Sequence, residues 1–178
     1  MPTAAAEALE RARRVRLMVF DVDGVLTDGR LWYGPAGEAL KAFSAHDGHG
    51  MKLLAASGVT LAILSGRSSP AVARRAAELG IRHLVQQAED KGAALGQLLA
   101  ALGIEAAAAG YMGDDVADLP AMRRCAFACA PREAPEAVRR HAHYVAQAPA
   151  GRGAVREVCE LLMRAQGTLE AALAAYLA

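Results

Sequence analysis

Residues 15–29 read VRLMVFDVDGVLTDG, and this stretch decides the fold. Val15–Phe20 is a short, mainly apolar run that stops abruptly at Asp21. A run of this length is typical of a strand buried on both faces of a parallel sheet. We expect further strands at the other short apolar runs, which are Val59–Leu64, His83–Val85, Ala107–Met112, Ala126–Ala130 and Tyr144–Val145.

Segments with helical patterning fill the intervals between these runs. They are Gly48–Ser57, Pro70–Leu79, Lys91–Leu102, Val116–Arg124, Glu133–His141 and Ala154–Gln166. Strands and helices in alternation imply right-handed crossovers. The sequence therefore predicts an α/β, Rossmann-like fold of three layers, with a mostly parallel central sheet and helices on both faces. No repeat or linker divides residues 1–178, so we expect a single domain.

The charge balance argues against two classes of partner. Twenty Lys and Arg face nineteen Asp and Glu, so neither nucleic acid nor an anionic membrane is an expected partner. No run is apolar enough for a membrane-spanning helix, and the charged first twenty residues lack the order of a secretory signal. Three cysteines without a CxxC pair predict neither a disulfide framework nor a zinc site. We expect a cytoplasmic protein with Cys125, Cys129 and Cys159 as buried thiols.

The segment 29–43, GRLWYGPAGEALKAF, interrupts the alternation of strands and helices. Trp32 and Tyr33 precede a Gly/Pro turn and a second semi-apolar run, which predicts a β-hairpin. An aromatic hairpin that projects from a small domain is often an interface, so we expect this one to serve oligomerisation. The alternative is that the hairpin folds onto the core of its own chain.

Polar side chains follow the predicted strands at the points where the strands end. Asp21 and Asp23 follow the first strand, Ser65 follows the second, and Asp114 and Asp115 follow a later one. Ligands of open α/β sheets bind beyond the carboxyl ends of the strands, so these side chains should converge. Gathered carboxylates repel one another, and Mg²⁺ is the natural compensating cation. For the Asp-x-Asp-Gly motif alone, a helix cap or an Asp-rich turn is the alternative.

Four motifs together resemble the haloacid dehalogenase superfamily of phosphotransferases. They are Asp21-Val22-Asp23-Gly24, Ser65-Gly66-Arg67, Lys91, and Gly113-Asp114-Asp115-Val116-Ala117-Asp118. The resemblance implies that Asp21 is a nucleophile that becomes an aspartyl-phosphate. It implies that Asp23 is the general acid and then the general base, with its backbone carbonyl on the metal. Gly24 would allow the sharp backbone turn between them.

The same resemblance implies roles for the later motifs. Ser65 would hydrogen-bond a phosphoryl oxygen, Lys91 would neutralise the phosphate and position Asp21, and Asp114 would complete the Mg²⁺ shell. Asp115 and Asp118 would orient Lys91 or metal-bound waters. For Asp118, a carboxylate favoured by the dipole in the first turn of a helix is the alternative.

The chain has no room for the cap domain that many members of this superfamily carry. A hairpin and one helix use all the residues between Thr27 and Val59, and one helix and one strand use those between Ser65 and Lys91. Water must then be excluded from the site by a macromolecular substrate or by a neighbouring subunit. The aromatic hairpin favours the neighbouring subunit.

At this level the chain resembles one family, the capless 3-deoxy-D-manno-octulosonate (KDO) 8-phosphate phosphatases. The matching stretches are 23–29 (DGVLTDG), 41–43 (KAF), 47–50 (DGHG), 65–67 (SGR), 113–115 (GDD) and 151–157 (GRGAVRE). The resemblance runs from Val15 to Leu169. It implies a homotetramer assembled through the hairpin, with each site roofed by a neighbour, and a product that feeds lipopolysaccharide synthesis.

The implied substrate, a small phosphorylated sugar acid, has an anionic group at each end and needs two cationic poles. Lys91 and Mg²⁺ would serve the phosphate, and Arg67, Lys52 and Arg75 the carboxylate or sugar end, although Arg75 could instead be a solvated surface residue. The complete set of expected substrate-binding residues is Asp23, Ser44, Ala45, His46, Asp47, Gly48, Lys52, Gly66, Arg67, Arg75 and Lys91.

Two departures from the family pattern keep other substrates and functions open. His46 and Lys52 stand where Arg is expected, which weakens guanidinium recognition of a carboxylate. A nine-carbon sugar acid 9-phosphate or a broad range of phosphates is therefore an alternative substrate. A non-catalytic metal-binding scaffold is an alternative of another class. By composition residues 151–153 suggest a mobile tail, with 150–178 as a C-terminal tail and helix, and the resemblance places Arg152 near a neighbouring site.

Overall fold

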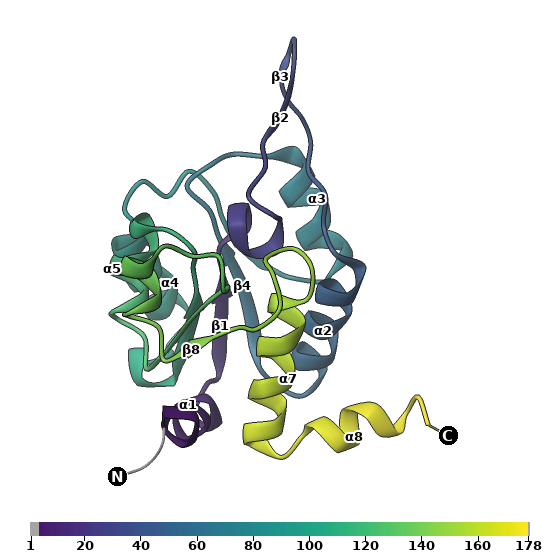
Figure 1. Ribbon diagram of the computed structural model, residues 1–178, viewed down its shortest axis with the longest axis vertical. Helices are drawn as coiled ribbons and strands as arrows, with labels where there is room; N and C mark the ends of the chain where they lie inside the picture. Colours follow the sequence, from purple (N-terminus) through teal and green to yellow (C-terminus); the bar gives the residue numbers. More distant parts are fainter. Residues whose placement is uncertain (1–3, 178) are drawn as a thin grey trace.

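The computed structural model describes residues 4–177. Within them, six strands form one sheet in the order β5-β4-β1-β6-β7-β8, with every neighbouring pair parallel. The neighbours β1 and β4 lie in the middle of the molecule (Figure 1). The strands are β1 (Leu17–Phe20), β4 (Thr60–Leu64), β5 (His83–Val85), β6 (Ala109–Met112), β7 (Phe127–Ala130) and β8 (Tyr144–Val145). Each strand lies inside a predicted apolar run, and the parallel sheet confirms the predicted fold class.

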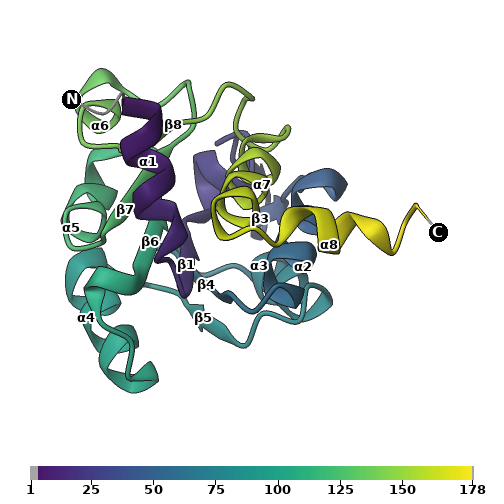
Figure 2. The same ribbon diagram turned by 90° about the horizontal axis from the view of Figure 1, so that it is seen from below.

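Side chains of β1 point alternately into two cores, one on each face of the sheet. Met18 and Phe20 pack with α1 (Ala4–Arg13), α2 (Ala45–Ala56), α3 (Pro70–Glu78), α7 (Ala154–Gln166) and α8 (Leu169–Ala174). Leu17 and Val19 pack with α4 (Lys91–Leu102), α5 (Leu119–Met122) and α6 (Glu136–Arg139). Figure 2 shows α4 and α5 on one side of the sheet and α2, α3 and α7 on the other. Burial on both faces explains why the sequence of β1 is continuously apolar.

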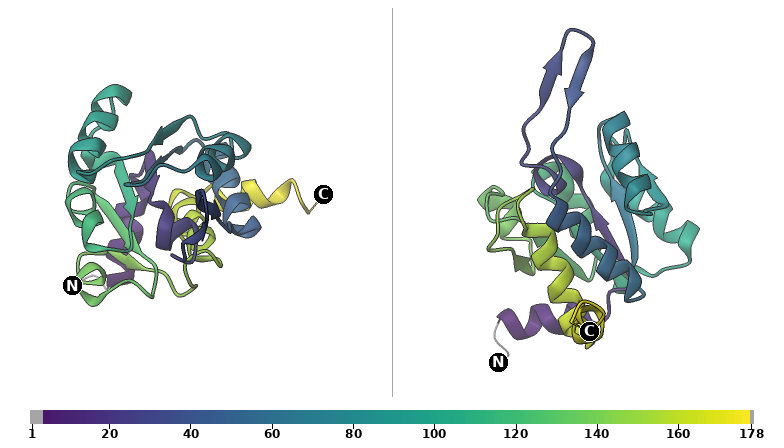
Figure 3. Two further views of the ribbon diagram at one scale, coloured as in Figure 1. Left: turned by 90° about the horizontal axis from the view of Figure 1, so that it is seen from above. Right: turned by 90° about the vertical axis from the view of Figure 1, so that its right-hand side faces the viewer.

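The predicted hairpin consists of β2 (Trp32–Gly34) and β3 (Gly37–Leu40), which pair antiparallel. It projects beyond the carboxyl ends of the sheet strands, as the right-hand view of Figure 3 shows. Trp32, Tyr33 and Leu40 are 51%, 61% and 54% exposed, so these side chains of the hairpin strands are not buried in the core of their own chain. Large apolar side chains gathered in this way mark interaction surfaces.

The described residues contain no cap domain, as predicted. Between Thr27 and β4 lie only the hairpin and α2, and between Ser65 and Lys91 lie only α3 and β5. Among residues 4–177, the sheet end that carries the site is therefore covered only by the hairpin base and the loops around it.

Several helix boundaries differ from the predictions. The segment predicted as one helix over Val116–Arg124 is a 3₁₀ turn, Val116–Asp118, followed by α5, which has Pro120 in its first turn. The helix predicted over Glu133–His141 begins only at Glu136, directly after Pro135. Proline suits the first turn of a helix but cannot donate a hydrogen bond further in, which explains both late starts. The patterns predicted neither α1 nor the bounds of α8.

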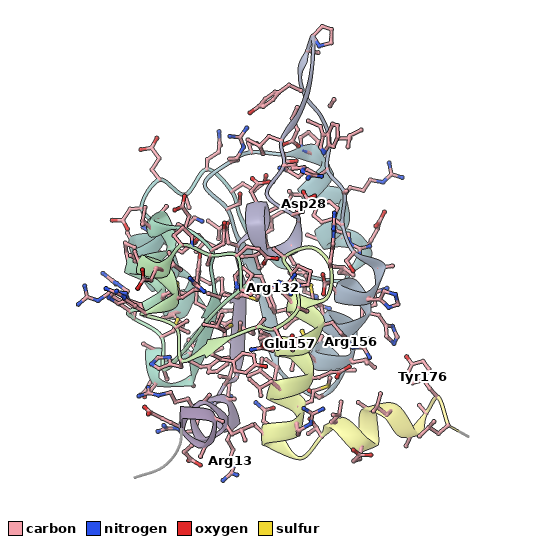
Figure 4. The ribbon with its side chains drawn as sticks, in the orientation of Figure 1. Arg13, Asp28, Arg132, Arg156, Glu157 and Tyr176 are labelled. Atoms are coloured by element: carbon pink, nitrogen blue, oxygen red, sulfur yellow. The ribbon has the colours of Figure 1, made fainter. Side chains whose placement is uncertain are left out.

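Residues 150–177 are not a tail as a whole. Helix α7 buries six side chains in the core, and the loop before it is held by a hydrogen bond from Gly151 N to Val25 O of 3.2 Å. Glu157 of α7 accepts hydrogen bonds from the backbone N–H groups of Gln147 and Ala148, at 2.9 and 2.8 Å, and Figure 4 labels it on the helix below this loop. The loop therefore has a defined conformation.

Helices α2 and α7 pack against each other through a buried aspartate. The Asp47 carboxylate accepts hydrogen bonds from the backbone N–H groups of Gly153 (3.2 Å) and Arg156 (2.8 Å), at the start of α7. Asp47 is 2% exposed, and its carboxylate caps α7, while its contact with substrate stays a prediction. These bonds satisfy donors that the first turn of a helix otherwise leaves unpaired.

We predict that Asp47→Ala destabilises the protein by about 1–3 kcal/mol, the cost of leaving buried backbone donors unpaired. Urea denaturation should show a lower midpoint, while KM should change little. The matched control for the denaturation midpoint is His46→Ala, because His46 is exposed on the same turn of α2. A raised KM with an unchanged midpoint would instead support the predicted substrate contact.

Candidate active site

The register of the parallel strands brings the predicted motifs to one edge of the sheet. Phe20 pairs with Ile63 of β4 and with Met112 of β6, and the Asp21 N–H donates to Met112 O at 3.0 Å. The residues that follow these strands, Asp21, Ser65 and Gly113-Asp114, therefore lie side by side. This is the convergence that the strand ends predicted.

Three carboxylates and one lysine form the centre of this edge. One carboxylate oxygen from each of Asp21, Asp114 and Asp118 lies within 4.8 Å of the others. Lys91 Nζ lies 2.9 Å from Asp21 Oδ1 and 2.7 Å from Asp118 Oδ1. Lys91 is the first residue of α4, which Asp90 caps by accepting a hydrogen bond from Ala93 N. Helix α4 thus places the Lys91 ammonium group beside the Asp21 carboxylate.

Asp118 is fully buried and its carboxylate is saturated with hydrogen bonds. Oδ1 accepts from Lys91 Nζ and from the Tyr111 hydroxyl at 2.8 Å, and Oδ2 accepts from Asp114 N and Asp115 N at 3.1 Å. Four donors use the four lone-pair positions of a carboxylate, so Asp118 has none left for a metal ion. This geometry supports the implied role of orienting Lys91 rather than that of ligand.

Asp114 is suited to bind a cation. Its Oδ1 atom is buried and has no hydrogen-bond partner among residues 4–177. Burial, and then the charges of Asp21 and Asp118, raise the pKa of Asp114 to about 8. Burial, and then the charge of Asp118, raise the pKa of Asp21 to about 6 despite Lys91. Carboxylates this crowded need more positive charge than one lysine supplies, which is the property expected of a Mg²⁺ site.

The turn after β1 leaves space for the Asp114 carboxylate. Gly24 has φ +91°, and a Cβ atom there would lie 2.1 Å from Asp114 Oδ2. A hydrogen bond from Gly24 N to the Thr27 hydroxyl at 3.3 Å holds this turn. Glycine is therefore required both by the backbone conformation and by the close approach. The carboxylates of Asp21 and Asp114 thus lie close enough together to bind one cation, as the implied magnesium shell requires.

Asp23 is surrounded by cations that come from beyond its own motif. Lys41 Nζ donates to Asp23 Oδ1, and Arg67 Nε lies 3.8 Å from Asp23 Oδ2. Arg67 also donates to the Tyr33 hydroxyl of the hairpin and lies over its ring. Arg67 was an expected substrate residue, whereas Lys41, although part of the matching KAF motif, had no expected role.

Ser65 and Asp115, two further predicted site residues, have different surroundings. Ser65 is buried at the end of β4, and its hydroxyl accepts a hydrogen bond from Arg67 N at 3.2 Å, so it lies in the same edge of the sheet. Asp115 is exposed, and its carboxylate accepts from its neighbour Val116 N at 2.7 Å. The structure thus gives Asp115 a capping role and shows no contact between its side chain and Lys91.

The predicted substrate loop contains an enclosed arginine. Arg75 Nη2 donates to Ser44 O at 3.1 Å, and the guanidinium lies over the Phe43 ring. A Cβ atom at Gly48 would lie 2.1 Å from Arg75 Nη2, so glycine is what allows the guanidinium to reach this loop. Only 20% of the Arg75 side chain is exposed, which argues against the solvated-surface alternative.

Three predicted substrate residues on α2, Ala45, His46 and Lys52, are exposed, as is Gly66. Within residues 4–177, no described contact joins His46 or Lys52 to the carboxylate cluster. Arg152 is also exposed, but it lines a cleft of about 280 Å³ together with Gly24 and Asp114 of its own chain. This is a different arrangement from the predicted reach into a neighbouring site.

The three cysteines are buried, as predicted. Burial raises the pKa of the Cys125 thiol to about 12, and raises those of Cys129 and Cys159 as well. Thiols in this state are poor nucleophiles, so the chemistry of the site belongs to the carboxylates. Among residues 4–177, no helix has the length and apolar character needed to cross a bilayer.

Comparison with known proteins assigns the family. The haloacid dehalogenase-like hydrolase family matches residues 38–126. The 3-deoxy-D-manno-octulosonate 8-phosphate phosphatases of Yersinia pestis and Escherichia coli K12 are each 42% identical over 168 residues, which cover 94% of this chain and 90% and 89% of theirs. The chain belongs to the 3-deoxy-D-manno-octulosonate 8-phosphate phosphatase family of haloacid dehalogenase-like hydrolases.

Solved structures of this phosphatase family share the whole fold. The Moraxella catarrhalis phosphatase, in complex with magnesium ion, phosphate ion and KDO, superposes with a TM-score of 0.93 at 43% identity. The match covers 96% of this chain and 98% of that one. The Yersinia pestis structure gives a TM-score of 0.90 at 40% identity, over 96% and 94% of the two chains. These findings confirm the resemblance, and the protein is a phosphatase.

We predict that the metal-free phosphatase loses stability between about pH 4 and about pH 8, because over this range the folded carboxylates hold protons that the unfolded chain has released. This contribution disappears as the pH rises through the raised pKa values of Asp21 and Asp114, about 6 and about 8. Added Mg²⁺ should therefore stabilise the protein more at the alkaline end of the range.

Chemical denaturation with EDTA or Mg²⁺ at several pH values measures this effect. Asp114→Asn removes one titrating carboxylate and should flatten the pH dependence of the metal-free protein. An Asp114→Asn slope equal to that of the wild type would show that Asp114 is not the group responsible.

Proposed function

We propose that this protein hydrolyses KDO 8-phosphate to KDO and inorganic phosphate, through an aspartyl-phosphate on Asp21 and with Mg²⁺ as cofactor. The observation that carries the proposal is the orphaned, buried Asp114 oxygen beside the Lys91–Asp21 pair, at the carboxyl end of β1. The substrate is the one named for relatives that match 94% of this chain.

In the first step, a carboxylate oxygen of Asp21 attacks phosphorus while Asp23 donates a proton to the departing sugar oxygen. Lys91 screens the charge of Asp21 and of the phosphoryl group, and the Ser65 hydroxyl donates to a phosphoryl oxygen. In the second step, Asp23 takes a proton from water, the water oxygen attacks phosphorus, and Asp21 is released. Mg²⁺ held by Asp21, Asp114 and the Asp23 carbonyl would neutralise phosphate charge and so allow the anionic nucleophile to approach.

The sugar-acid end of the substrate would be read by the guanidinium groups at the rim of the site. Arg67 lies beside Asp23, and Arg75 is held at the Ser44 carbonyl. Because His46 and Lys52 replace expected arginines, hydrolysis of a nine-carbon sugar acid 9-phosphate, or broad specificity, is the second candidate. The complete set of Asp21, Asp23, Ser65, Lys91 and Asp114 argues against the scaffold alternative.

We also propose a cytoplasmic homotetramer that supplies lipopolysaccharide synthesis, in which a neighbouring subunit closes each site. The absence of a cap between the elements of residues 4–177 and the exposed apolar side chains of the hairpin support this assembly. A lid is needed because water at an open site would compete with the substrate and weaken its electrostatic contacts.

Asp21→Asn should lower phosphate release below detection, because the amide nitrogen and oxygen cannot form the aspartyl-phosphate. The assay compares kcat/KM for eight- and nine-carbon keto-acid phosphates, with Mg²⁺, with Ca²⁺ and after reversible chelation. Asp115→Asn is the matched control and should keep most of the activity. Full activity of Asp21→Asn would refute the mechanism, and a preference for the nine-carbon substrate would support the second candidate.

The hairpin should hold the assembly together. The double variant Trp32→Ser/Leu40→Ser removes two exposed apolar side chains, each worth about 2 kcal/mol when buried at an interface. Light scattering should show that the double variant dissociates, and the phosphate-release assay should show a loss of activity. The control is Leu177→Ser, the same leucine-to-serine change at an exposed position outside the hairpin, which should leave the mass of the assembly unchanged. A fully active wild-type monomer would remove the argument for a neighbouring lid.

A further inference from the structure

We propose that Lys41 is a positioning residue for Asp23, and that it leaves Asp23 Oδ2 as the atom that exchanges protons with the substrate. The inference rests on the proposed role of Asp23 as general acid and base. It links the hairpin of this chain to the proton-transfer step, because Lys41 follows directly on β3.

Lys41 is a buried charge whose partners are both carboxylates. Its side chain is 1% exposed, and its Nζ atom donates to Asp23 Oδ1 and lies 3.0 Å from Glu38 Oε2. Burial alone lowers the pKa of the Lys41 amine, but the hydrogen bonds to Asp23 and Glu38 outweigh burial and raise that pKa. A buried ammonium group is held in place by such partners, because moving away would leave it unpaired.

Glu38 anchors this lysine to the body of the protein. Glu38 Oε1 accepts a hydrogen bond from the Ser69 hydroxyl, and Ser69 N donates to Gln86 Oε1 at 2.6 Å. Ser69 also caps α3 by accepting from Val72 N. The chain Asp23–Lys41–Glu38–Ser69 therefore joins the turn after β1 to the start of α3. A side chain held at both ends in this way supplies a fixed donor rather than a mobile charge.

The two oxygens of Asp23 are thereby made different. Oδ1 is occupied by Lys41, while Oδ2 faces Arg67 Nε at 3.8 Å, which is beyond hydrogen-bond distance. During transfer to Asp21, the proton on Asp23 Oδ2 passes to the ester oxygen as the bond from that oxygen to phosphorus breaks. The electron pair of the broken bond stays on the oxygen that receives the proton. Without Lys41, the Asp23 carboxyl group could turn Oδ2 away from the ester oxygen.

This role predicts a dependence on the leaving group that a purely structural role does not produce. A leaving group that is stable as an anion departs without a proton, whereas a basic one needs the general acid. The value of kcat/KM reports the steps up to the transfer of phosphorus to Asp21, and so excludes the later water step. A series of aryl phosphates of similar shape, from p-nitrophenyl to phenyl phosphate, changes the leaving group while none carries the sugar-acid end that Arg67 and Arg75 would bind.

The experiment measures log kcat/KM against leaving-group pKa for wild type, Lys41→Met and Asp23→Asn, with Mg²⁺ affinity measured by calorimetry on each. We expect Lys41→Met to lose about ten-fold more on phenyl than on p-nitrophenyl phosphate, in the direction shown by Asp23→Asn, with Mg²⁺ affinity unchanged. If Lys41→Met folds poorly, Lys41→Met/Glu38→Gln removes the stranded carboxylate as well and should give the same steeper slope.

Two outcomes would overturn the inference in distinguishable ways. An equal loss across the series for Lys41→Met, with a steeper slope for Asp23→Asn, would overturn the positioning role and leave the proposed function intact. A slope for Asp23→Asn that equals the wild-type slope would refute the role of Asp23 itself, and the inference would fail with it.

Discussion

The ion pair between Lys91 and Asp118 is the interaction on which the geometry of the site depends. The Asp118 carboxylate accepts hydrogen bonds from Lys91, from Tyr111 and from the backbone N–H groups of Asp114 and Asp115, which use all of its acceptor positions. These hydrogen bonds hold the Lys91 ammonium group beside Asp21. They also hold the backbone of the segment that carries the Asp114 carboxylate. Close packing maintains this arrangement, since a Cβ atom at Gly113 would lie 2.4 Å from Asp118 Cβ. A fully satisfied buried network of this kind is rigid, and a rigid site can hold like charges together until a cation and a substrate neutralise them.

The hairpin shows how a capless fold can use one short element for two purposes. Its strands expose Trp32 and Leu40, which suits contact with another subunit. The strand that returns from the tip carries Glu38 and Lys41 back into the polar network around Asp23. A subunit that bound these exposed side chains would therefore contact the same hairpin that also contacts Asp23. Assembly and catalysis could not be changed independently in such a design.

The sequence was most informative where one physical requirement dominated. Continuous apolar runs such as Val59–Leu64 predicted the strands, because burial on both faces of a parallel sheet allows no other pattern. Asp21 and Lys91 could be recognised because their motifs follow strand ends or begin helices. Lys41 was missed because a single lysine next to a hairpin gives no periodic signal, and its partners Asp23 and Glu38 are revealed only by the folded hairpin base. The cap formed by Asp47 was missed for the converse reason: its position in the loop suggested a ligand, while the partners of its carboxylate lie more than a hundred residues away at the start of α7.

The loop before α7 also limits how this protein can vary. Gly151 has φ +62°, and a Cβ atom there would lie 2.6 Å from the Thr27 carbonyl carbon and 2.7 Å from Asp28 N. The backbone of the loop rests directly on the chain that leads into the hairpin. Asp28, labelled in Figure 4 near the hairpin base, marks this point of contact. A side chain at position 151 would force this loop away from the Thr27–Asp28 backbone. The cleft beside Asp114, which both segments line, would then become wider. Natural variants should thus tolerate many changes at exposed Arg152 but keep glycine at position 151.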